Sequence, residues 1–407
     1  MAQCCERRRG RAELGRRVGV VAAAALALAL AAPAQAQRLV TLTTTSKYVD
    51  PAKQQFNKPP PGEPERPNAL RVNVLLPDGY DEGGRFPVLY LLHGHGDTYD
   101  AWANRERGDV EDIARGFPGL IVMPEGAQGW YADWWNAGKR ANPAWERYYL
   151  DELIPLIERT FRIRKGRQWH AIAGLSMGAE GSVYFAEQRP GYFGSVASFS
   201  GPLSIQRPEY ADGGMDTQGQ KFTDVFGPTD GFYATAHNPM ANVVNLKSTR
   251  AYVTVGNGVG SFSDATNYFG AIAEADLHQH ADDFVAAAKD AGVDVTYAPR
   301  NGVHDWPYWR EHLAAAIKWG FFKPVAKAPA RWQLRTASQT GDAWGFSFAF
   351  AKPPTEIETF KRNGDRIAAS GAGSVTIRAP NGRRFSAKLP FDRRIPAKAR
   401  KRAHRRR

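Results

Sequence analysis

Strand-like and helix-like segments alternate along residues 70–322, and this rhythm restricts the chain to few folds. Apolar runs such as Phe86–Leu92 and Gly119–Met123 show no polar alternation, which is typical of parallel strands buried on both faces. Segments with helical spacing lie between the strands, as at Pro143–Thr160 and Tyr268–Ala291. Repeated βα units predict an α/β protein with a mostly parallel sheet and helices on both faces.

Residues 202–247 interrupt this rhythm. They are polar and rich in Gly and Pro, so we expect them to form an excursion over the edge of the sheet. The other strands and helices expected in the α/β region are Arg71–Leu76, Val110–Arg115, Trp169–Ala173, Gly178–Gln188, Gly194–Phe199, Ala251–Val255, Val293–Ala298 and Pro307–Trp319.

The composition changes near Lys323-Pro324, and turns such as Asn363-Gly364-Asp365 and Asn381-Gly382 become frequent. Such turns between short strands are typical of hairpins. We therefore expect an α/β catalytic domain over residues 37–325 and a small antiparallel β module over residues 330–390. The β-like runs of the module are Trp332–Thr336, Trp344–Phe350, Glu356–Phe360, Ser374–Arg378 and Arg384–Leu389.

Residues 1–36 have the pattern of a secretory signal peptide. A basic start precedes the apolar run Val18–Ala32, and the small-residue sequence Ala34-Gln35-Ala36 follows as a cleavage signal. We expect the mature protein to be secreted or associated with the cell envelope, and not to span a membrane after cleavage. Both cysteines, Cys4 and Cys5, lie in the leader. This excludes a cysteine nucleophile or a thiolate metal site from the mature chain.

The basic charge is concentrated at the ends of the chain. The formal net charge is +13, of which residues 1–36 carry +4 and residues 391–407 carry +8. We expect residues 391–407 to be a disordered basic tail. Such a tail is either a solvated terminus or a segment that adheres to an anionic polymer of the cell envelope. A nucleic acid partner is not expected, because an exported chain seldom meets one.

The motif Gly174-Leu175-Ser176-Met177-Gly178 lies between an expected strand and an expected helix. This G-x-S-x-G pattern in that context is typical of a nucleophile elbow, a tight turn that needs small residues two positions before and after the serine. It predicts that Ser176 is a nucleophile and that the backbone N–H of Met177 is one donor to an oxyanion.

A serine hydroxyl needs a base, and His304 is the best candidate among the nine histidines. It lies between the last expected strand and the last expected helix, where α/β enzymes with a serine nucleophile place their base. Among the other histidines, we expect His170 to be packed in the core. His278 and His280 are expected on a solvated helix face, and His312 at the surface.

Three carboxylates after the strand Ala251–Val255 are candidates for the acid that orients the base. Asp264 follows the strand directly, which is the usual position. Glu274 lies on the next helix and is longer by one methylene group, so it can reach the base from a greater distance. Asp276 is the third candidate.

The run His93-Gly94-His95-Gly96-Asp97 has two readings. An H-x-H-x-D run is half of a dinuclear metal site, but such a site is normally completed by a second His directly after the Asp, where this chain has Thr98. The other reading is a turn after a buried strand, in which the backbone N–H of His95 pairs with that of Met177 to hold an oxyanion. We prefer the second reading, and we expect no metal and no cofactor.

Five segments together resemble the putative-esterase branch of the α/β hydrolases, which includes the antigen 85 mycolyltransferases and the S-formylglutathione hydrolases (esterase D). The resemblance covers about residues 68–322. It implies an α/β hydrolase fold and acyl transfer by a Ser–acid–His triad without a metal. It also places the second oxyanion donor on His95 and the acid on Glu274. The segments are Leu91–Gly96, Val122–Gly126, Tyr131–Trp135, Gly174–Gly178 and Asn301–Trp309.

Two positions depart from the mycolyltransferases, which carry an Asp and an Arg that engage trehalose where this chain has His93 and Gly96. The departure argues against trehalose as the acyl acceptor. An aromatic cluster around Trp130 and Trp134 is either part of the core or a contact for an aromatic, sugar or acyl group of the substrate.

The sequence therefore predicts an exported serine esterase that hydrolyses carboxylic esters through an acyl-enzyme. One alternative is an acyltransferase of the cell envelope. Another is an envelope-binding protein without catalytic activity on a hydrolase scaffold. The presence of both Ser176 and His304 argues against the last alternative, because a binding protein is free to lose them.

Overall fold

The computed structural model describes residues 36–54, 70–140, 142–211, 215 and 219–395. The expected signal peptide, apart from Ala36, lies outside the described residues, and so do residues 396–407 of the expected basic tail. Within the described ranges, no helix is both long enough and apolar enough to cross a bilayer. We call residues 36–329 the α/β unit and residues 330–395 the β module.

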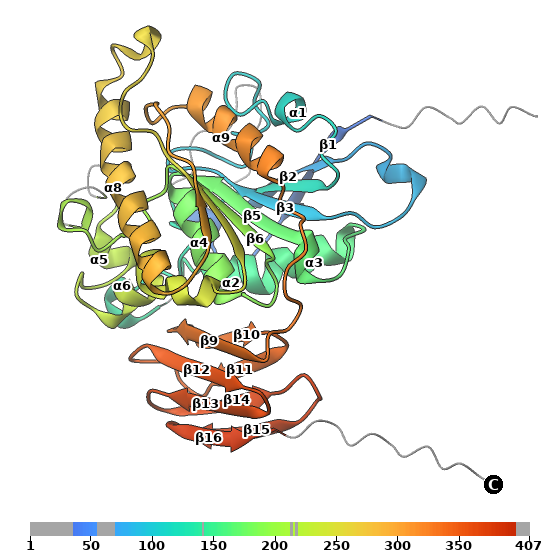
Figure 1. The fold of residues 1–407 in the computed structure, drawn as a ribbon, viewed down its shortest axis with the longest axis vertical. Coiled ribbons are helices and arrows are strands. Elements are labelled where there is room, and N and C mark those ends of the chain that lie inside the picture. The colour runs from blue at the N-terminus through green and yellow to red at the C-terminus, as the bar shows by residue number, and fades with distance from the viewer. Residues whose placement is uncertain (1–35, 55–69, 141, 212–214, 216–218, 396–407) are drawn as a thin grey trace, which may run out of the picture. The chain divides into compact units, whose positions relative to one another are not determined.

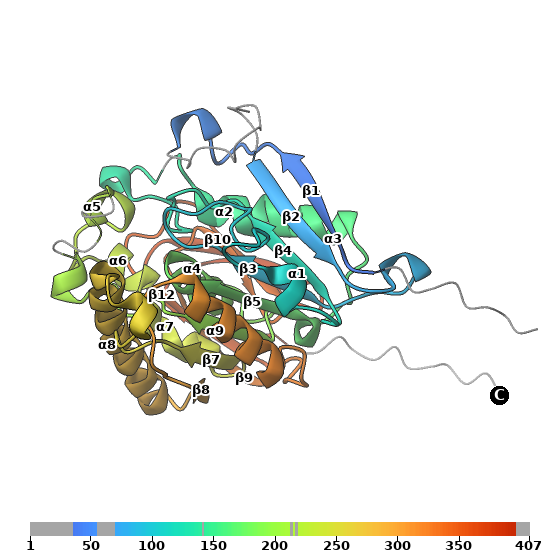
Figure 2. The ribbon, with the colours of Figure 1, turned by 90° about the horizontal axis from the view of Figure 1, so that it is seen from above.

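The α/β unit is built on an eight-stranded sheet in the order β1-β2-β4-β3-β5-β6-β7-β8 (Figure 1). Its first two pairs, β1 with β2 and β2 with β4, are antiparallel, and the other pairs are parallel. Figure 2 shows β1 and β8 at opposite edges. The strands are β1 (Arg38–Thr44), β2 (Leu70–Leu76), β3 (Val88–Leu92), β4 (Leu120–Pro124), β5 (His170–Leu175), β6 (Ser195–Phe199), β7 (Arg250–Thr254) and β8 (Val295–Tyr297).

Helices cover both faces of this sheet, so the central strands are buried on both sides. Leu89 and Leu91 of β3 pack in a cluster with α1 and α9, whereas Val88 and Tyr90 pack in a second cluster with α3, α4 and α8. This arrangement confirms the expected fold class. The helices are α1 (Val110–Ile113), α2 (Trp145–Arg147), a π-helical turn (Tyr148–Leu153), α3 (Ile154–Thr160), α4 (Met177–Gln188), α8 (Tyr268–Asp290) and α9 (Trp306–Trp319).

The excursion over residues 202–247 contains more regular structure than its composition suggests. Its described part contains short helices, among them α5 (Phe222–Val225), α6 (Phe232–His237) and α7 (Pro239–Asn242). Each has four to six residues. Such short helices carry no periodic signal in the sequence and depend on packing for their stability. Strand β1 was also not expected, and it forms by pairing along the edge strand β2.

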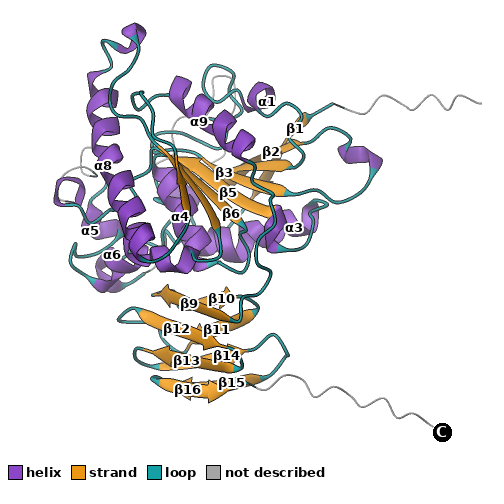
Figure 3. Ribbon diagram, viewed as in Figure 1, coloured by secondary structure: helices purple, strands orange, loops and turns teal. Residues whose placement is uncertain are grey.

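The β module consists of two four-stranded antiparallel sheets, as Figure 3 shows. Alternate residues of its strands face a core of aromatic and aliphatic side chains between the sheets. One sheet has the order β10-β11-β14-β15 and the other β16-β13-β12-β9. The strands are β9 (Arg331–Thr336), β10 (Thr340–Ala343), β11 (Phe346–Phe350), β12 (Glu358–Asn363), β13 (Arg366–Ser370), β14 (Ser374–Arg378), β15 (Arg384–Lys388) and β16 (Phe391–Arg394).

Strand β16 corrects the expected boundary at residue 390. Phe391–Arg394 pairs with β13 as an edge strand, and Phe391 packs against the ring of Phe385. The expected tail from residue 391 was therefore wrong in its first residues, because basic side chains at an edge strand point into solvent without disturbing the ladder.

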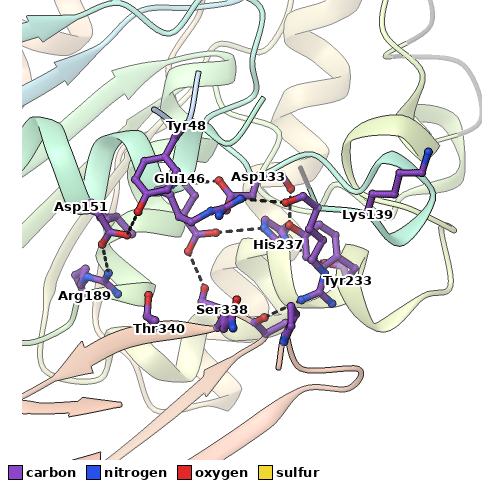
Figure 4. Close-up of a pocket in the computed structure, with 16 residues that line it drawn as sticks. Tyr48, Asp133, Lys139, Glu146, Asp151, Arg189, Tyr233, His237, Ser338 and Thr340 are labelled. Carbon is purple, nitrogen blue, oxygen red and sulfur yellow. Dashed lines mark hydrogen bonds and ion pairs between the residues drawn. The ribbon is translucent and has the colours of Figure 1, made fainter. Parts of the chain in front are cut away.

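Polar contacts join the β module to the α/β unit around a cavity of about 480 Å³ (Figure 4). The Ser338 hydroxyl donates to Glu146 Oε1 at 2.7 Å, and Arg189 Nε lies 3.2 Å from Asp342 Oδ2. Arg140 donates to two main-chain carbonyls of the module. Of these contacts, only that between Arg189 and Asp342 pairs two opposite charges, so removing Asp342 would leave the largely buried Arg189 without this counter-charge.

Candidate active site

Ser176 lies at a sharp turn between β5 and α4. Its φ angle of 52° is in the left-handed region, which a residue with a side chain adopts only when its surroundings require it. A Cβ on Gly174 would clash with the Gly178 carbonyl oxygen, and a Cβ on Gly178 would clash with the carbonyl of His93. Both glycines of the motif are therefore required for the close approach of backbone to backbone.

The turn after β3 packs directly against this elbow. A Cβ on Gly94 would clash with the Leu175 side chain and lie 3.3 Å from the Ser176 Cβ. Within the described residues, the backbone N–H groups of His95 and Met177 donate to no other group. These are the two donors expected from the sequence, and both remain available to an oxygen atom bound beside Ser176.

His304 reaches Ser176 from the loop before α9. Its Nε2 lies 3.0 Å from the Ser176 Oγ, a hydrogen-bond distance. The His304 backbone N–H donates to the Gly270 carbonyl oxygen at 3.0 Å, and the ring meets Trp309 edge to face at 4.8 Å between centroids. These contacts fix the imidazole on the side facing the elbow.

Glu274 is the candidate carboxylate that contacts His304. Its Oε2 lies 2.7 Å from His304 Nδ1, and its side chain is fully buried. The other two candidates have other partners in the described chain. Asp264 accepts hydrogen bonds from Ser261 and from the Tyr308 hydroxyl, and Asp276 lies 3.5 Å from His280.

Two groups that the sequence reasoning missed hold the second oxygen of Glu274. The Ser200 hydroxyl and the Gly256 backbone N–H each donate to Oε1 at 2.6 Å. Ser200 follows β6 and Gly256 follows β7, and these two parallel strands are neighbours in the sheet. Because functional groups of α/β proteins gather at the carboxyl ends of such strands, these positions could have been predicted as part of the site. Ser200 also has a positive φ of 54°, which turns its hydroxyl towards the acid.

These contacts determine the charge of Glu274. Burial alone would raise its pKa, but the hydrogen bond and positive charge of His304, with the donors Ser200 and Gly256, outweigh burial and lower the pKa below its ordinary value. The carboxylate therefore stays ionised next to His304.

The side chains of the H-x-H-x-D run diverge to separate partners. His93 Nε2 lies 3.3 Å from Glu125, His95 Nε2 lies 2.6 Å from Gln220 Oε1, and Asp97 pairs with Arg107 at 2.9 Å. No group of three His, Asp, Cys or Glu side chains in the described residues is arranged to hold a metal ion.

Glu125, another residue that the sequence reasoning missed, braces the turn. Its buried carboxylate accepts hydrogen bonds from the backbone N–H groups of Tyr99, Gly126 and Ala127. Burial would lower the pKa of His93, but the contact with Glu125 outweighs it and raises the pKa. Glu125 thus ties the loop after β4 to the turn after β3.

The two tryptophans proposed for substrate binding differ in their surroundings. Trp130 is only 2% exposed and packs against His95, Tyr210 and Phe226. Of the two alternatives that the sequence left open, burial therefore favours a place in the core for Trp130, because the neighbouring aromatic side chains cover its ring. Trp134 is partly exposed and lines a cavity of about 340 Å³ together with Gln220.

Two histidines were expected in solvent and are buried instead. His280 contacts the Ser204 hydroxyl of the excursion at 3.1 Å, and His312 lies on the buried face of α9 against Phe199. Both lie on helices rich in Ala, where composition does not distinguish the inner face from the outer one. His170 is buried as expected and stacks on Tyr192.

Comparison with known proteins gives consistent results. The family model described as "Putative esterase" matches residues 65–319. Esterase Rv1288 of Mycobacterium tuberculosis is 32% identical over 236 residues, which cover 54% of this chain and 49% of that protein. The chain thus spans about half the length of this curated relative. The diacylglycerol acyltransferase/mycolyltransferase Ag85C of Mycobacterium avium is 26% identical, covering 58% of this chain and 70% of the relative.

Solved structures show the same fold. A ferulic acid esterase matches with a TM-score of 0.53 and 24% identity, covering 70% of this chain and 98% of that one. The S-formylglutathione hydrolase FrmB of Staphylococcus aureus matches with a TM-score of 0.52 and 19% identity, covering 70% and 99%. The fold is that of the α/β hydrolases. The family match spans more than half of the chain and includes the turn after β3, the turn at Ser176 and the loop that carries His304, so this chain belongs to the putative esterase family.

Proposed function

We propose that this chain is an exported serine esterase that hydrolyses carboxylic esters through an acyl-enzyme. The observation that carries the proposal is the hydrogen-bonded series from Ser176 through His304 to Glu274. This series stands at the carboxyl ends of buried parallel strands, next to two free backbone N–H groups. Family membership supports ester chemistry as the reaction class.

In the acylation half, Ser176 Oγ attacks the ester carbonyl carbon while His304 Nε2 accepts the hydroxyl proton. The negative charge that forms on the carbonyl oxygen is held by the N–H groups of His95 and Met177. His304 then gives the proton to the departing alcohol oxygen as the carbon–oxygen bond breaks. Glu274 stabilises the imidazolium that exists between these two steps.

In the deacylation half, water replaces the alcohol. His304 accepts a proton from the water as its oxygen attacks the acyl carbon, and the same two N–H groups hold the second oxyanion. Collapse of this intermediate returns the proton to Ser176 Oγ and releases the carboxylic acid.

A second candidate is transfer of the acyl group to an alcohol instead of water. The relatives named diacylglycerol acyltransferase/mycolyltransferase favour it, because this chain covers 70% of one of them. The chemistry differs only in the group that enters the deacylation step. His93 is held by Glu125 and Gly94, so it presents no charged side chain to a sugar acceptor in the way described for the mycolyltransferases.

Export is supported by the basic and apolar pattern of residues 1–36. Adhesion to an anionic polymer of the cell envelope is supported by the cations of residues 396–407, and by exposed cations of the β module. Arg378 and Arg384 lie directly opposite each other on β14 and β15. Like charges in that position are unfavourable without an anion nearby.

The decisive experiment measures hydrolysis of p-nitrophenyl esters of increasing acyl length by the wild-type protein and by Ser176→Ala. Products are identified by mass in the presence and absence of glycerol and of sugar alcohols. Free acid as the main product under all conditions is expected for an esterase. An acylated alcohol as the main product would establish transfer instead, and equal rates for the two proteins would refute the serine mechanism.

A further inference from the structure

The exposed large apolar side chains gather in one short segment. Within the described residues they are five, with exposed fractions from 58% for Val259 to 98% for Phe262. The segment is the yellow projection at the start of α8 in Figure 1. Soluble proteins rarely leave several large apolar groups together in water without a partner for them. We call these residues the apolar tip: Val259, Phe262, Tyr268, Phe269 and Ile272.

Hydrogen bonds within the segment hold the apolar tip in this outward arrangement. Asp264 accepts from the Ser261 N–H at 2.7 Å and from the Tyr308 hydroxyl at 2.6 Å. The Asn267 side chain accepts from the Gly270 N–H at 2.9 Å and thereby caps α8. The polar groups of the segment are therefore hydrogen-bonded to one another or to Tyr308, and this network holds the backbone with the apolar side chains in solvent.

The apolar tip is directly connected to the catalytic residues. Helix α8 carries Phe269 and Ile272 and, two residues after Ile272, the buried Glu274. The Gly270 carbonyl accepts the backbone N–H of His304. Any surface that binds the apolar tip is consequently held beside the acid and the base.

Charge restricts what this surface can be. Residues 256–275 contain two charged side chains, Asp264 and Glu274, and no Lys or Arg. Glu274 is buried against His304, so Asp264 is the one charge near the solvent. Segments that bind anionic membranes combine apolar side chains with basic ones, and this segment lacks the basic ones. An uncharged apolar surface is the complementary partner.

We propose that the apolar tip docks onto the surface of aggregated, uncharged acyl esters and holds the catalytic residues there. The proposal rests on the esterase function proposed above and adds the physical form of the substrate. Water-soluble esters need no such docking, because they reach Ser176 by diffusion as single molecules.

The kinetic test uses tributyrin, an uncharged ester, below and above its solubility limit. We expect the wild-type rate to rise steeply when droplets form. The variant Phe262→Ser/Phe269→Ser should lose this rise and keep its rate on p-nitrophenyl acetate. Transfer of each aromatic side chain out of water contributes roughly tenfold to adsorption, so the pair should weaken it about 100-fold. The matched control Phe262→Leu/Phe269→Leu keeps the apolar area and should retain most of the rise.

A binding test without catalysis separates this proposal from the esterase proposal. Ser176→Ala protein should float with tributyrin droplets, and the same protein with both Ser substitutions in the apolar tip should stay in the aqueous phase. The docking proposal would be overturned if both proteins floated with the droplets, or if Ser176→Ala protein bound vesicles that contain anionic lipid in preference to droplets. A wild-type dimer that the Ser substitutions dissociate, with unchanged flotation, would instead assign the apolar tip to a second copy of the chain. Failure to hydrolyse p-nitrophenyl acetate would refute the esterase and leave the flotation result to decide the docking.

Discussion

The strands of the α/β unit and those of the β module bury their side chains in different ways. Every residue of β3, β5 and β6 is buried, whereas β11 alternates between buried and exposed residues. Helices cover both faces of the first sheet, while each sheet of the module covers only one face of the other. Fully buried strands are held by packing on both faces, so their ends can position a nucleophile. The outer faces of the module are open to solvent, which suits binding.

The two regions also differ in charge. Residues 37–329 contain 34 acidic and 29 basic side chains, whereas residues 330–390 contain 4 acidic and 10 basic ones. The net charge of residues 37–390 is close to zero, but it is the sum of an acidic α/β unit and a basic β module. This difference in charge fits the proposal that ester chemistry belongs to the α/β unit and adhesion to anionic material to the β module and the basic C-terminal residues.

The largest expected effect is at the elbow. Ser176→Ala should lower kcat on p-nitrophenyl acetate by roughly 10⁴–10⁶-fold, because the nucleophile is removed. The matched control, Ser347→Ala on the exposed face of β11, should leave the rate unchanged. Comparable losses from the two substitutions would contradict the assignment of chemistry to the α/β unit.

Next comes the acid. Glu274→Gln should lower kcat by about 10⁴-fold, because His304 loses the carboxylate that orients it and stabilises its charged form. The control Asp264→Asn should cost less than about tenfold, because Asp264 bonds Ser261 and Tyr308 and does not contact His304. The reverse ranking in steady-state kinetics would transfer the acid role to Asp264.

The α/β unit should lose stability at acid pH through His312. Burial lowers the pKa of His312 from 6.5 to about 4, opposed in part by the charge of Glu274. Since the folded state resists protonation, stability is complete above pH 6.5 and falls as the pH drops from there towards 4. Urea unfolding should show a loss of about 2 kcal/mol between pH 7.5 and 5 from this residue. The variant His312→Phe should not show this loss of unfolding free energy at acid pH. If its stability depends on pH as that of the wild type does, protonation of His312 is not the cause.

The β module should lose stability as the pH rises, in the opposite direction to the α/β unit, because of Glu358. Burial raises the pKa of Glu358 from 4.5 to about 7, and the Ala372 N–H opposes this only in part. The folded module therefore binds a proton that the unfolded chain releases, and stability declines as the pH rises from 4.5 through 7. Glu358→Gln should flatten this decline in urea midpoints between pH 5 and 8. A steeper decline in the variant would refute the interpretation.

The smallest expected effect on catalysis is that of removing the basic C-terminal residues. Deletion of residues 396–407 removes seven Lys or Arg side chains and leaves β16 intact. We expect kcat to be unchanged and retention on an anionic polymer at low salt to fall roughly tenfold, with the difference vanishing as salt screens the charges. Residual retention should come from Arg378 and Arg384, so Arg378→Gln/Arg384→Gln in the truncated chain should lower it further. Equal retention of all three proteins would show that neither segment binds.

The site was easier to predict than its surroundings. The G-x-S-x-G motif identifies Ser176 because steric limits on an elbow leave few sequences that can form one, and His304 follows from its place between the last strand and the last helix. Ser200, Gly256 and Glu125 carry no motif, since their roles arise only when separate strands end side by side. The burial of Trp130 also could not be predicted from the sequence, because the side chains that cover it, Tyr210 and Phe226, are distant from it in the chain.

By itself, the sequence determined the α/β class, the two regions and the serine–histidine pair, because hydrophobic periodicity and glycine placement are local properties. Tertiary structure decided which carboxylate meets His304. Asp264, Glu274 and Asp276 differ little in sequence, and only the packing of α8 against the ends of β6 and β7 brings Glu274 within 2.7 Å of the imidazole. It also decided that Phe262 and Phe269 face solvent, since burial depends on what the rest of the chain places nearby.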